Sequence, residues 1–278
     1  MKKNTFKIIF DIVLTFGIVL LYKKNVLGLG FHELAGIAIC VLFIVHNLIN
    51  RKWIAAVTKN LFSKTTPVKT RIEYIVDVLL CLLFLGVFIT GIGISKKYLS
   101  AIAFLGNKGI PWHFFFSGCA LILTGIHIGL HWKWIFGTVL GKNKDRVPRP
   151  VHIICIVIFV AMMVGGCYAL CTSSMKRWIS APFTSSVNFK GQESQKGQMM
   201  KAMDGDFATI SDSQSENQND KKISQNMSKN MPERRGHQNQ TISLKNVIFV
   251  ILRFTGILIF FAGLTAIVEW LLRKFLAH

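Results

Sequence analysis

The sequence predicts an all-α integral membrane protein. Six long apolar runs lie along its 278 residues, 51% of its residues are hydrophobic, and its mean hydropathy is +0.45. An apolar run of about 20 residues is long enough to cross a bilayer core as a helix. We therefore expect six transmembrane helices, at about residues 6–22, 31–48, 72–95, 112–136, 151–171 and 244–275.

The first apolar run begins with charged residues, as a signal peptide does. It has no small-residue cleavage site, so we expect residues 6–22 to remain as the first spanning helix. The second and fourth runs differ from the others in carrying paired histidines, His32 with His46 and His113 with His127. An ionisable side chain inside a membrane helix is costly and indicates a functional site.

The two histidine-bearing runs share one pattern. In both runs the histidines are fourteen residues apart, and a tryptophan follows the second histidine after seven residues, at Trp53 and Trp134. Fourteen residues of α-helix give about 320° of rotation and ~21 Å of rise, so the imidazoles of one run share a face at two depths. We interpret the pattern as a two-fold internal repeat, in which the first four helices form a four-helix bundle and two further transmembrane helices follow.

Basic residues in the short loops predict the orientation. Sixteen Lys and Arg residues flank the helices on one side and five on the other. The positive-inside rule then puts both termini in the cytoplasm, with the protein a multi-pass component of the cytoplasmic membrane. His32 and His113 would lie at the outer side, and His46 and His127 at the inner side. The net charge of +20 follows this loop pattern without any nucleic-acid-binding motif, so we expect no nucleic-acid partner.

We expect the chain to have four parts. They are a four-helix membrane domain at 1–140, a fifth helix within 141–171, a low-complexity and mostly disordered extracytoplasmic loop at 172–243, and a sixth helix with a cytoplasmic tail at 244–278. The loop is rich in Gln, Asn, Ser and Lys and cannot bury enough apolar surface to order itself. Its methionines suit either Cu(I) binding or a plain tether, and they are Met175, Met199, Met200, Met203, Met227 and Met231.

Histidines on facing membrane helices are suited to be axial ligands of haem. Two neutral imidazoles make a six-coordinate site for electron transfer, and helical bundles hold such sites between facing side chains. We expect two haem b groups, an outer one on His32 and His113 and an inner one on His46 and His127. The alternatives are histidines that serve packing, or a zinc site, which requires a tetrahedral ligand cluster. No C-x-x-C-H motif for covalent haem attachment occurs.

His131 competes with His127 for the inner haem. It lies one turn later on the same face of the helix. Its counterpart in the repeat is Asn50, a poor haem ligand, which favours His127 and leaves His131 and Asn50 near the haem edge or the membrane interface. Trp53 and Trp134 fit an aromatic belt at the inner interface.

Three charged residues are candidates to support the haem sites. Asp11 and Asp77 each precede an apolar run in the first and third helices. Either could accept the Nδ1–H of a ligating histidine, take part in proton transfer, or lie at the interface as a charge that reaches water. Arg253 lies inside the sixth helix, where it could pair with a haem propionate or reach the outer headgroups.

The motifs resemble those of a known family. H-E-x-x-G with a second histidine fourteen residues after the first, then N-R-x-W, and the later W-H…H-x-x-x-H-W-K-W are similar to the flavinylation-associated cytochrome family, formerly a domain of unknown function. The resemblance covers about residues 6–136, with the family's histidine positions at His32, His46, His113 and His127. It implies a membrane di-haem b-type cytochrome that exchanges electrons with extracytoplasmic flavoproteins carrying covalent FMN. A flavin attachment site would read D-G-x-S-G-A-T, and the nearest stretch, 204–209, lacks this pattern, so we expect no covalent flavin on this chain.

The sequence predicts an electron-transfer component and not a stand-alone enzyme. It contains no nucleophile–base pair, phosphate-binding loop or dinucleotide fingerprint. Electrons would cross the membrane to or from an extracytoplasmic FMN-carrying flavoprotein. Two alternatives remain open, namely a quinol-oxidising cytochrome b subunit that reacts with the quinone pool, and a non-redox membrane scaffold or metal-binding protein.

Overall fold

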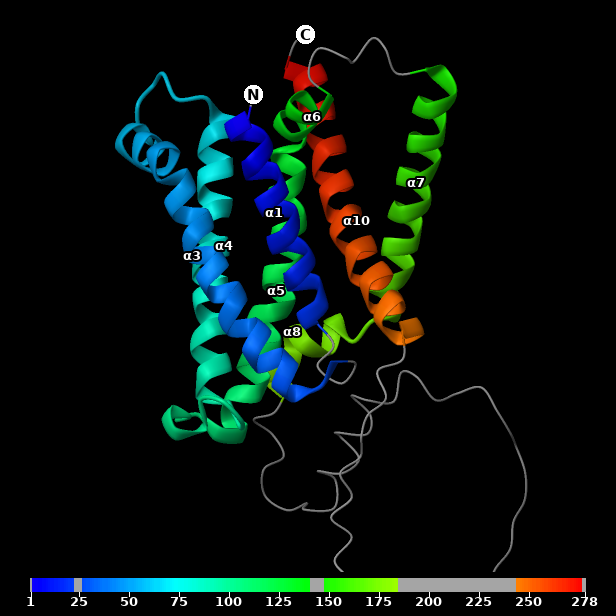
Figure 1. Ribbon diagram of the computed structural model, residues 1–278. Coiled ribbons are helices and arrows are strands. Elements are labelled where there is room, and N and C mark those ends of the chain that lie inside the picture. Colours follow the sequence, from blue (N-terminus) through cyan, green and yellow to red (C-terminus); the bar gives the residue numbers. More distant parts are fainter. Residues whose placement is uncertain (1, 23–26, 141–147, 185–243, 277–278) are drawn as a thin grey trace, which may run out of the picture. The chain divides into compact units, whose positions relative to one another are not determined.

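The described part of the chain is helical throughout. The computed structural model describes residues 2–22, 27–140, 148–184 and 244–276, and no strand occurs among them (Figure 1). The α-helices are α1 (Lys2–Leu21), α3 (Leu29–Asn60), α4 (Val68–Gly93), α5 (Gly109–Leu130), α6 (Trp132–Leu140), α7 (Arg149–Thr172), α8 (Met175–Thr184) and α10 (Leu244–Leu276). Two short 3₁₀ turns, η1 (Ser100–Ile102) and η2 (Gly106–Lys108), connect α4 to α5.

Among the described residues, five helical segments are long and apolar enough to cross a membrane. They are Leu29–Asn60, Val68–Gly93, Gly106–Leu130, Ile153–Thr184 and Leu244–Phe275. The first predicted segment is helical as α1, but it is not among these five. Large apolar side chains such as Ile44, Leu82 and Val157 are exposed on the helices. Lipid would cover this surface at no hydrophobic cost, so the prediction of a helical, multi-pass membrane protein agrees with the fold.

Two apolar core clusters hold the helices together. The first unites α1, α3, α4 and α5 through Leu14, Ile18, Ile39, Leu80, Phe84 and Ala120. The second unites α1, α5, α7, α8 and α10 through Val19, Leu121, Ala169, Met175, Val250, Phe254, Ile257 and Leu258. In Figure 1, α3 and α4 lie on one side of α1 and α5, and α10 and α7 lie on the other. The first cluster therefore joins the four helices that carry the sequence repeat.

Small residues let α5 and α7 approach α10 closely. An added Cβ at Gly125 of α5 would lie 2.7 Å from Phe261 Cβ, and one at Gly129 would lie 2.5 Å from the Ala262 carbonyl oxygen of α10. A Cβ at Gly166 of α7 would overlap the Gly256 carbonyl of α10. Such contacts between small residues are a main source of packing between membrane helices, where water provides no hydrophobic driving force.

The fourth predicted helix is interrupted in the structure. Residues 112–136 were expected as one helix, but α5 ends at Leu130 and α6 begins at Trp132. His131 ends α5, with φ −89° and ψ 2°, and its N–H bonds the carbonyls of His127 and Gly129. The histidine pair 127 and 131 therefore lies at a bend between two helices and not within a straight helix.

Helix α8 lies in a segment that the sequence analysis placed in the loop 172–243. Met175 is buried, and the Trp178 ring stacks 6.2 Å from the ring of Tyr22 and 6.1 Å from that of Phe254. These contacts bury the apolar side chains at the start of the segment, which the polar composition of the whole stretch had concealed. Residues 185–243, with the remaining methionines of the loop, lie outside the described residues.

Charged side chains join three helices at the end where α1 begins and α10 ends. The Glu269 carboxylate of α10 binds Lys69 of α4 at 3.1 Å and Lys133 of α6 at 3.9 Å, and it also binds Arg273 of its own helix. Lys69 bonds Glu73 as well, at 3.3 Å. This network fixes the end of α10 against α4 and α6.

Candidate haem-ligand site

The four repeat histidines lie on α3 and α5, at two levels. The two helices run in the same direction because α4 returns between them (Figure 1). His32 and His113 occupy the first turns of α3 and α5, whereas His46 and His127 lie fourteen residues later. Ile39 and Ala120 fall midway between the two levels, and both are buried in the first core cluster. A layer of apolar side chains thus separates an outer and an inner pair.

The outer pair has its rings face to edge. The ring centres of His32 and His113 are 6.1 Å apart, with 78° between the ring planes. His113 Nδ1 lies 3.1 Å from the Thr90 hydroxyl of α4, and that hydroxyl donates to the Gly86 carbonyl at 2.6 Å. Thr90 therefore accepts the Nδ1–H of His113. Gly91 follows Thr90, and a Cβ there would lie 3.4 Å from the His113 ring, so the small residue leaves room for the ring.

Glu33 fixes the loop beside the outer pair. Its carboxylate accepts hydrogen bonds from Ser95 Oγ at 2.8 Å and from the backbone N–H groups of residues 96, 97 and 98 at 2.9–3.1 Å. These bonds tie the first turn of α3 to the chain that leaves α4. The H-E-x-x-G motif contains Glu33, but its spacing alone did not indicate this role. The acidic residue directly after His32 was the sequence feature that could have indicated a role for Glu33.

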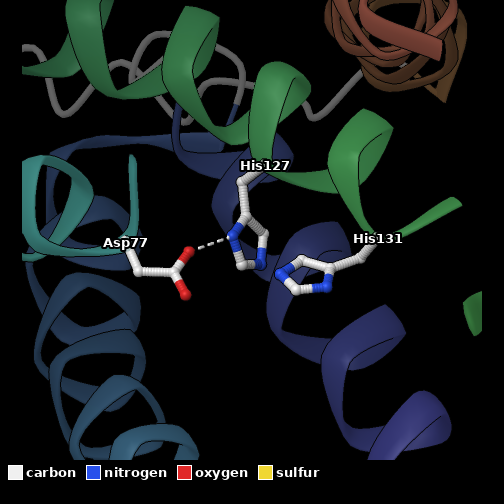
Figure 2. A group of neighbouring side chains, drawn as sticks. All are labelled: Asp77, His127 and His131. Atoms are coloured by element: carbon white, nitrogen blue, oxygen red, sulfur yellow. Dashed lines mark hydrogen bonds and ion pairs between the residues drawn. The ribbon is translucent and has the colours of Figure 1, made fainter. Parts of the chain in front are cut away.

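The inner histidines are both bonded to aspartates. His46 Nδ1 lies 2.7 Å from Asp11 Oδ1, which joins α3 to α1. His127 Nδ1 lies 2.6 Å from Asp77 Oδ1, which joins α5 to α4 (Figure 2). The same atoms therefore make the same bond in both halves of the repeat. Among the alternatives for Asp11 and Asp77, these contacts favour hydrogen bonding to histidine over a free interfacial charge.

His131 and Asn50 lie next to the inner histidines and contact different neighbours. The His131 ring centre is 4.7 Å from that of His127 and 6.5 Å from that of Trp53. Asn50 donates to the His46 carbonyl at 3.1 Å and accepts a bond from Lys7 Nζ at 2.9 Å. Ligand atoms of Asp77, His127 and His131 lie within 4.8 Å of one another (Figure 2). His131 and Asn50 are thus adjacent to the inner histidines.

Arg253 is not brought to the histidines. Its guanidinium lies 5.9 Å from the ring centre of Phe249, one turn earlier on α10. Among the described residues, no ion pair joins Arg253 to an acidic side chain. The contact with Phe249 does not distinguish a propionate partner of Arg253 from the outer headgroups.

The outer pair is compatible with ligation of one metal atom from two sides. A metal–imidazole bond is about 2.0–2.1 Å long, so two opposed bonds place the ring centres ~6 Å apart. The observed separation is 6.1 Å. At the inner level the Nδ1 atoms are held by carboxylates, which leaves Nε2 of each ring for a ligand. In the described part of the chain the inner rings make no ring contact with each other.

Comparison with known proteins found no matching family model, no matching curated protein and no matching solved structure. The conclusions about function therefore depend on the arrangement of these side chains.

Proposed function

We propose that the protein transfers electrons across a membrane as a di-haem b-type cytochrome. The observation that carries the proposal is the outer pair, whose two imidazoles come from separate helices and have their ring centres 6.1 Å apart. A histidine that serves only packing has no need of a second histidine at this separation. The apolar surface of the helices supports a location within lipid.

The inner level supports the same proposal through the bonds of its histidines. A histidine that ligates a metal commonly gives its other N–H to a carboxylate, which fixes the tautomer and the direction of the ring. Asp11 and Asp77 do this for His46 and His127. Two unrelated structural histidines would not be expected to share the same partner type and the same atoms.

Each part of the chain has a defined task in this proposal. Haem, when bound, supplies an iron that accepts and releases one electron. The four histidines would hold the two haems through Nε2, and Asp11, Asp77 and Thr90 orient the rings of His46, His127 and His113. The apolar layer around Ile39 and Ala120 excludes water and ions between the two levels. About 21 Å of helix separates these levels, so two cofactors would carry an electron through most of the bilayer core.

We propose an FMN-carrying extracytoplasmic flavoprotein as the partner. The loop bias of sixteen basic residues against five puts the outer pair on the extracytoplasmic side. The Glu33-bound loop presents Lys96 and Lys97 beside that pair, which would attract an acidic partner. The quinone pool is the alternative reaction partner. A quinone analogue that shifts the haem spectrum would favour it.

Visible spectra of ligand variants test the proposal. Protein purified in detergent from haem-replete cells should show b-type bands in reduced-minus-oxidised spectra. His32→Ala and His46→Ala should each lose about half of this signal and keep the rest. Asn47→Ala is the matched control, because Asn47 is adjacent to His46 but bonds only the Phe43 carbonyl of its own helix. Equal spectra for all four proteins would contradict the assignment.

The inner cluster also favours a second candidate, a metal-binding protein. Asp77, His127 and His131 place three ligand groups within 4.8 Å, and zinc takes such ligands. Zinc analysis of haem-depleted protein distinguishes the two functions. One zinc per chain that disappears with His131→Ala would support the metal site. Under the cytochrome proposal, His131→Ala leaves haem content unchanged.

A further inference from the structure

The two histidine levels differ in the charge of their hydrogen-bond acceptors. At the inner level, carboxylates accept from His46 and His127 at 2.7 Å and 2.6 Å. At the outer level, a neutral hydroxyl, that of Thr90, bonds His113 at the longer distance of 3.1 Å. The acidic residue nearest the outer pair, Glu33, has its carboxylate bonded to Ser95 and to backbone N–H groups. The repeat is thus symmetric in its histidines and asymmetric in their partners.

We propose that this asymmetry sets the haem at His46 and His127 at a lower reduction potential than the haem at His32 and His113. The inference rests on the proposed function. A carboxylate acceptor makes the imidazole a stronger electron donor to iron, which stabilises the oxidised form. The two negative charges act in the same direction, and their effect is large where the effective dielectric constant is low.

The cations near the inner level bond groups other than the two aspartates. At the inner end, Lys7 is bonded to the amide oxygen of Asn50, and Lys69 is paired with Glu73 and Glu269. Neither forms an ion pair with Asp11 or Asp77 among the described residues. At the outer end, Lys96 and Lys97 add positive charge near the other pair, and the Glu33 carboxylate adds one negative charge that is held by Ser95 and by backbone N–H groups. The outer pair thus has two basic side chains and one acidic side chain beside it, whereas a carboxylate bonds each inner histidine directly. This difference favours the proposed order of potentials.

The order of potentials gives the pathway a direction. With haem bound at both levels, His46 and His127 would hold the more reducing group and His32 and His113 the more oxidising one. An electron would then pass from the inner level to the outer level, without transfer of an atom or a proton between them. Equilibrium favours this step over its reverse. With the orientation proposed above, electrons leave the cytoplasmic side for an extracytoplasmic acceptor such as the oxidised FMN of a flavoprotein.

Redox titration of single-site variants tests the order. Full-length protein in detergent is titrated and followed by its visible spectrum. The wild type should show two reduction steps. His46→Ala should keep only the higher-potential haem, and His32→Ala only the lower-potential one. The opposite retention would overturn the proposal, and so would a single potential shared by both variants.

Aspartate variants test the cause. Asp77→Asn preserves shape and removes the charge, so the lower step should move to higher potential and the upper step should stay. Asp77→Glu keeps a carboxylate, so its lower step should lie close to the wild-type potential. Asp11→Asn should raise the potential of the lower step as Asp77→Asn does, because Asp11 bonds the other inner histidine, His46. Retention of both haems without any shift in Asp11→Asn and Asp77→Asn would overturn the assigned cause. Protein without any haem would contradict the proposed function itself, which separates the two failures.

Discussion

The most specific feature at the scale of single residues is a bond that occurs twice. Asp11 accepts a hydrogen bond from Nδ1 of His46, and Asp77 accepts one from Nδ1 of His127. The two histidines occupy equivalent positions in the two halves of the repeat. A carboxylate within a membrane helix is costly unless it is bonded, and each aspartate here has a partner at 2.7 Å or less. Each bond occupies Nδ1 of its ring and leaves Nε2 for a ligand, which a binding site requires and simple packing does not.

The choice between His127 and His131 gives a prediction at this scale. His127→Ala should leave about one haem per chain, because it removes the ring that Asp77 orients. His131→Ala should leave about two, since His131 contacts the edge of His127 and ends the helix. Haem content by pyridine haemochrome measures both. The reverse result would make His131 the inner ligand, with the bend at residue 131 as part of the site.

Glu33 joins helix α3 to the loop that follows α4 through its hydrogen bonds. Glu33→Ala removes the acceptor of four hydrogen bonds and releases the 95–98 loop from α3. Bonds to a charged group contribute about 1.5–3 kcal/mol each, so we expect haem affinity at the outer site to fall by tenfold or more. Haem titration of protein depleted of haem measures this. Glu33→Gln keeps an acceptor oxygen and should lose less. An effect on the inner haem alone would contradict the position given to Glu33.

Neighbouring glycines of α7 test helix packing. Gly166→Ala would place a methyl group against the Gly256 backbone of α10, whereas Gly165→Ala meets nothing within 4 Å. Overpacking of this kind typically costs about 1–3 kcal/mol. Thermal unfolding in detergent should therefore show a lower midpoint for Gly166→Ala and little change for Gly165→Ala. Equal effects would mean that α7 does not lie against α10 in this register.

Sequence periodicity predicted the helices better than their ends. The second apolar run continues as α3 to Asn60, past the predicted end at residue 48, because the basic stretch after it keeps helix-forming residues. The bend at His131 could not be predicted, since nothing in the apolar pattern marks it. Helix α8 was missed because a few buried side chains, Met175 and Trp178 among them, precede a long polar stretch.

At the scale of the whole molecule, the repeat placed the four histidines at two levels. The sequence indicated Asp11 and Asp77 as candidate partners of ligating histidines, but not which histidine each of them bonds. The equal spacing of the histidines on two parallel helices was sufficient to predict that they lie at two levels. The choice of neighbours among the apolar helices depends on close contacts at single small residues, such as Gly125 and Gly129 of α5 against α10. The apolar runs of the sequence are too similar to one another to reveal these contacts. The asymmetry between the Thr90 and aspartate acceptors likewise required the structure.

The segment 172–243 provides a prediction for the complete protein. Its local count is eleven Lys and Arg against seven Asp and Glu over residues 172–245, so we expect it to guide an acidic partner. Deletion of 190–240 should keep both haems and slow electron transfer to the flavoprotein, more at low salt, where charges are less screened. Stopped-flow oxidation of the reduced protein measures the rate. Loss of both haems on deletion would contradict this role, and protease cleavage of the segment from the cytoplasmic side would contradict the orientation.

The haem content of the purified protein tests the central claim most directly. Protein from haem-replete cells should contain about two b-type haems per chain, and its electron paramagnetic resonance spectrum should show two low-spin signals typical of bis-histidine ligation. The variant with all four repeat histidines replaced by alanine should contain none. A colourless wild-type protein, or a four-alanine variant that keeps its haem, would contradict the account.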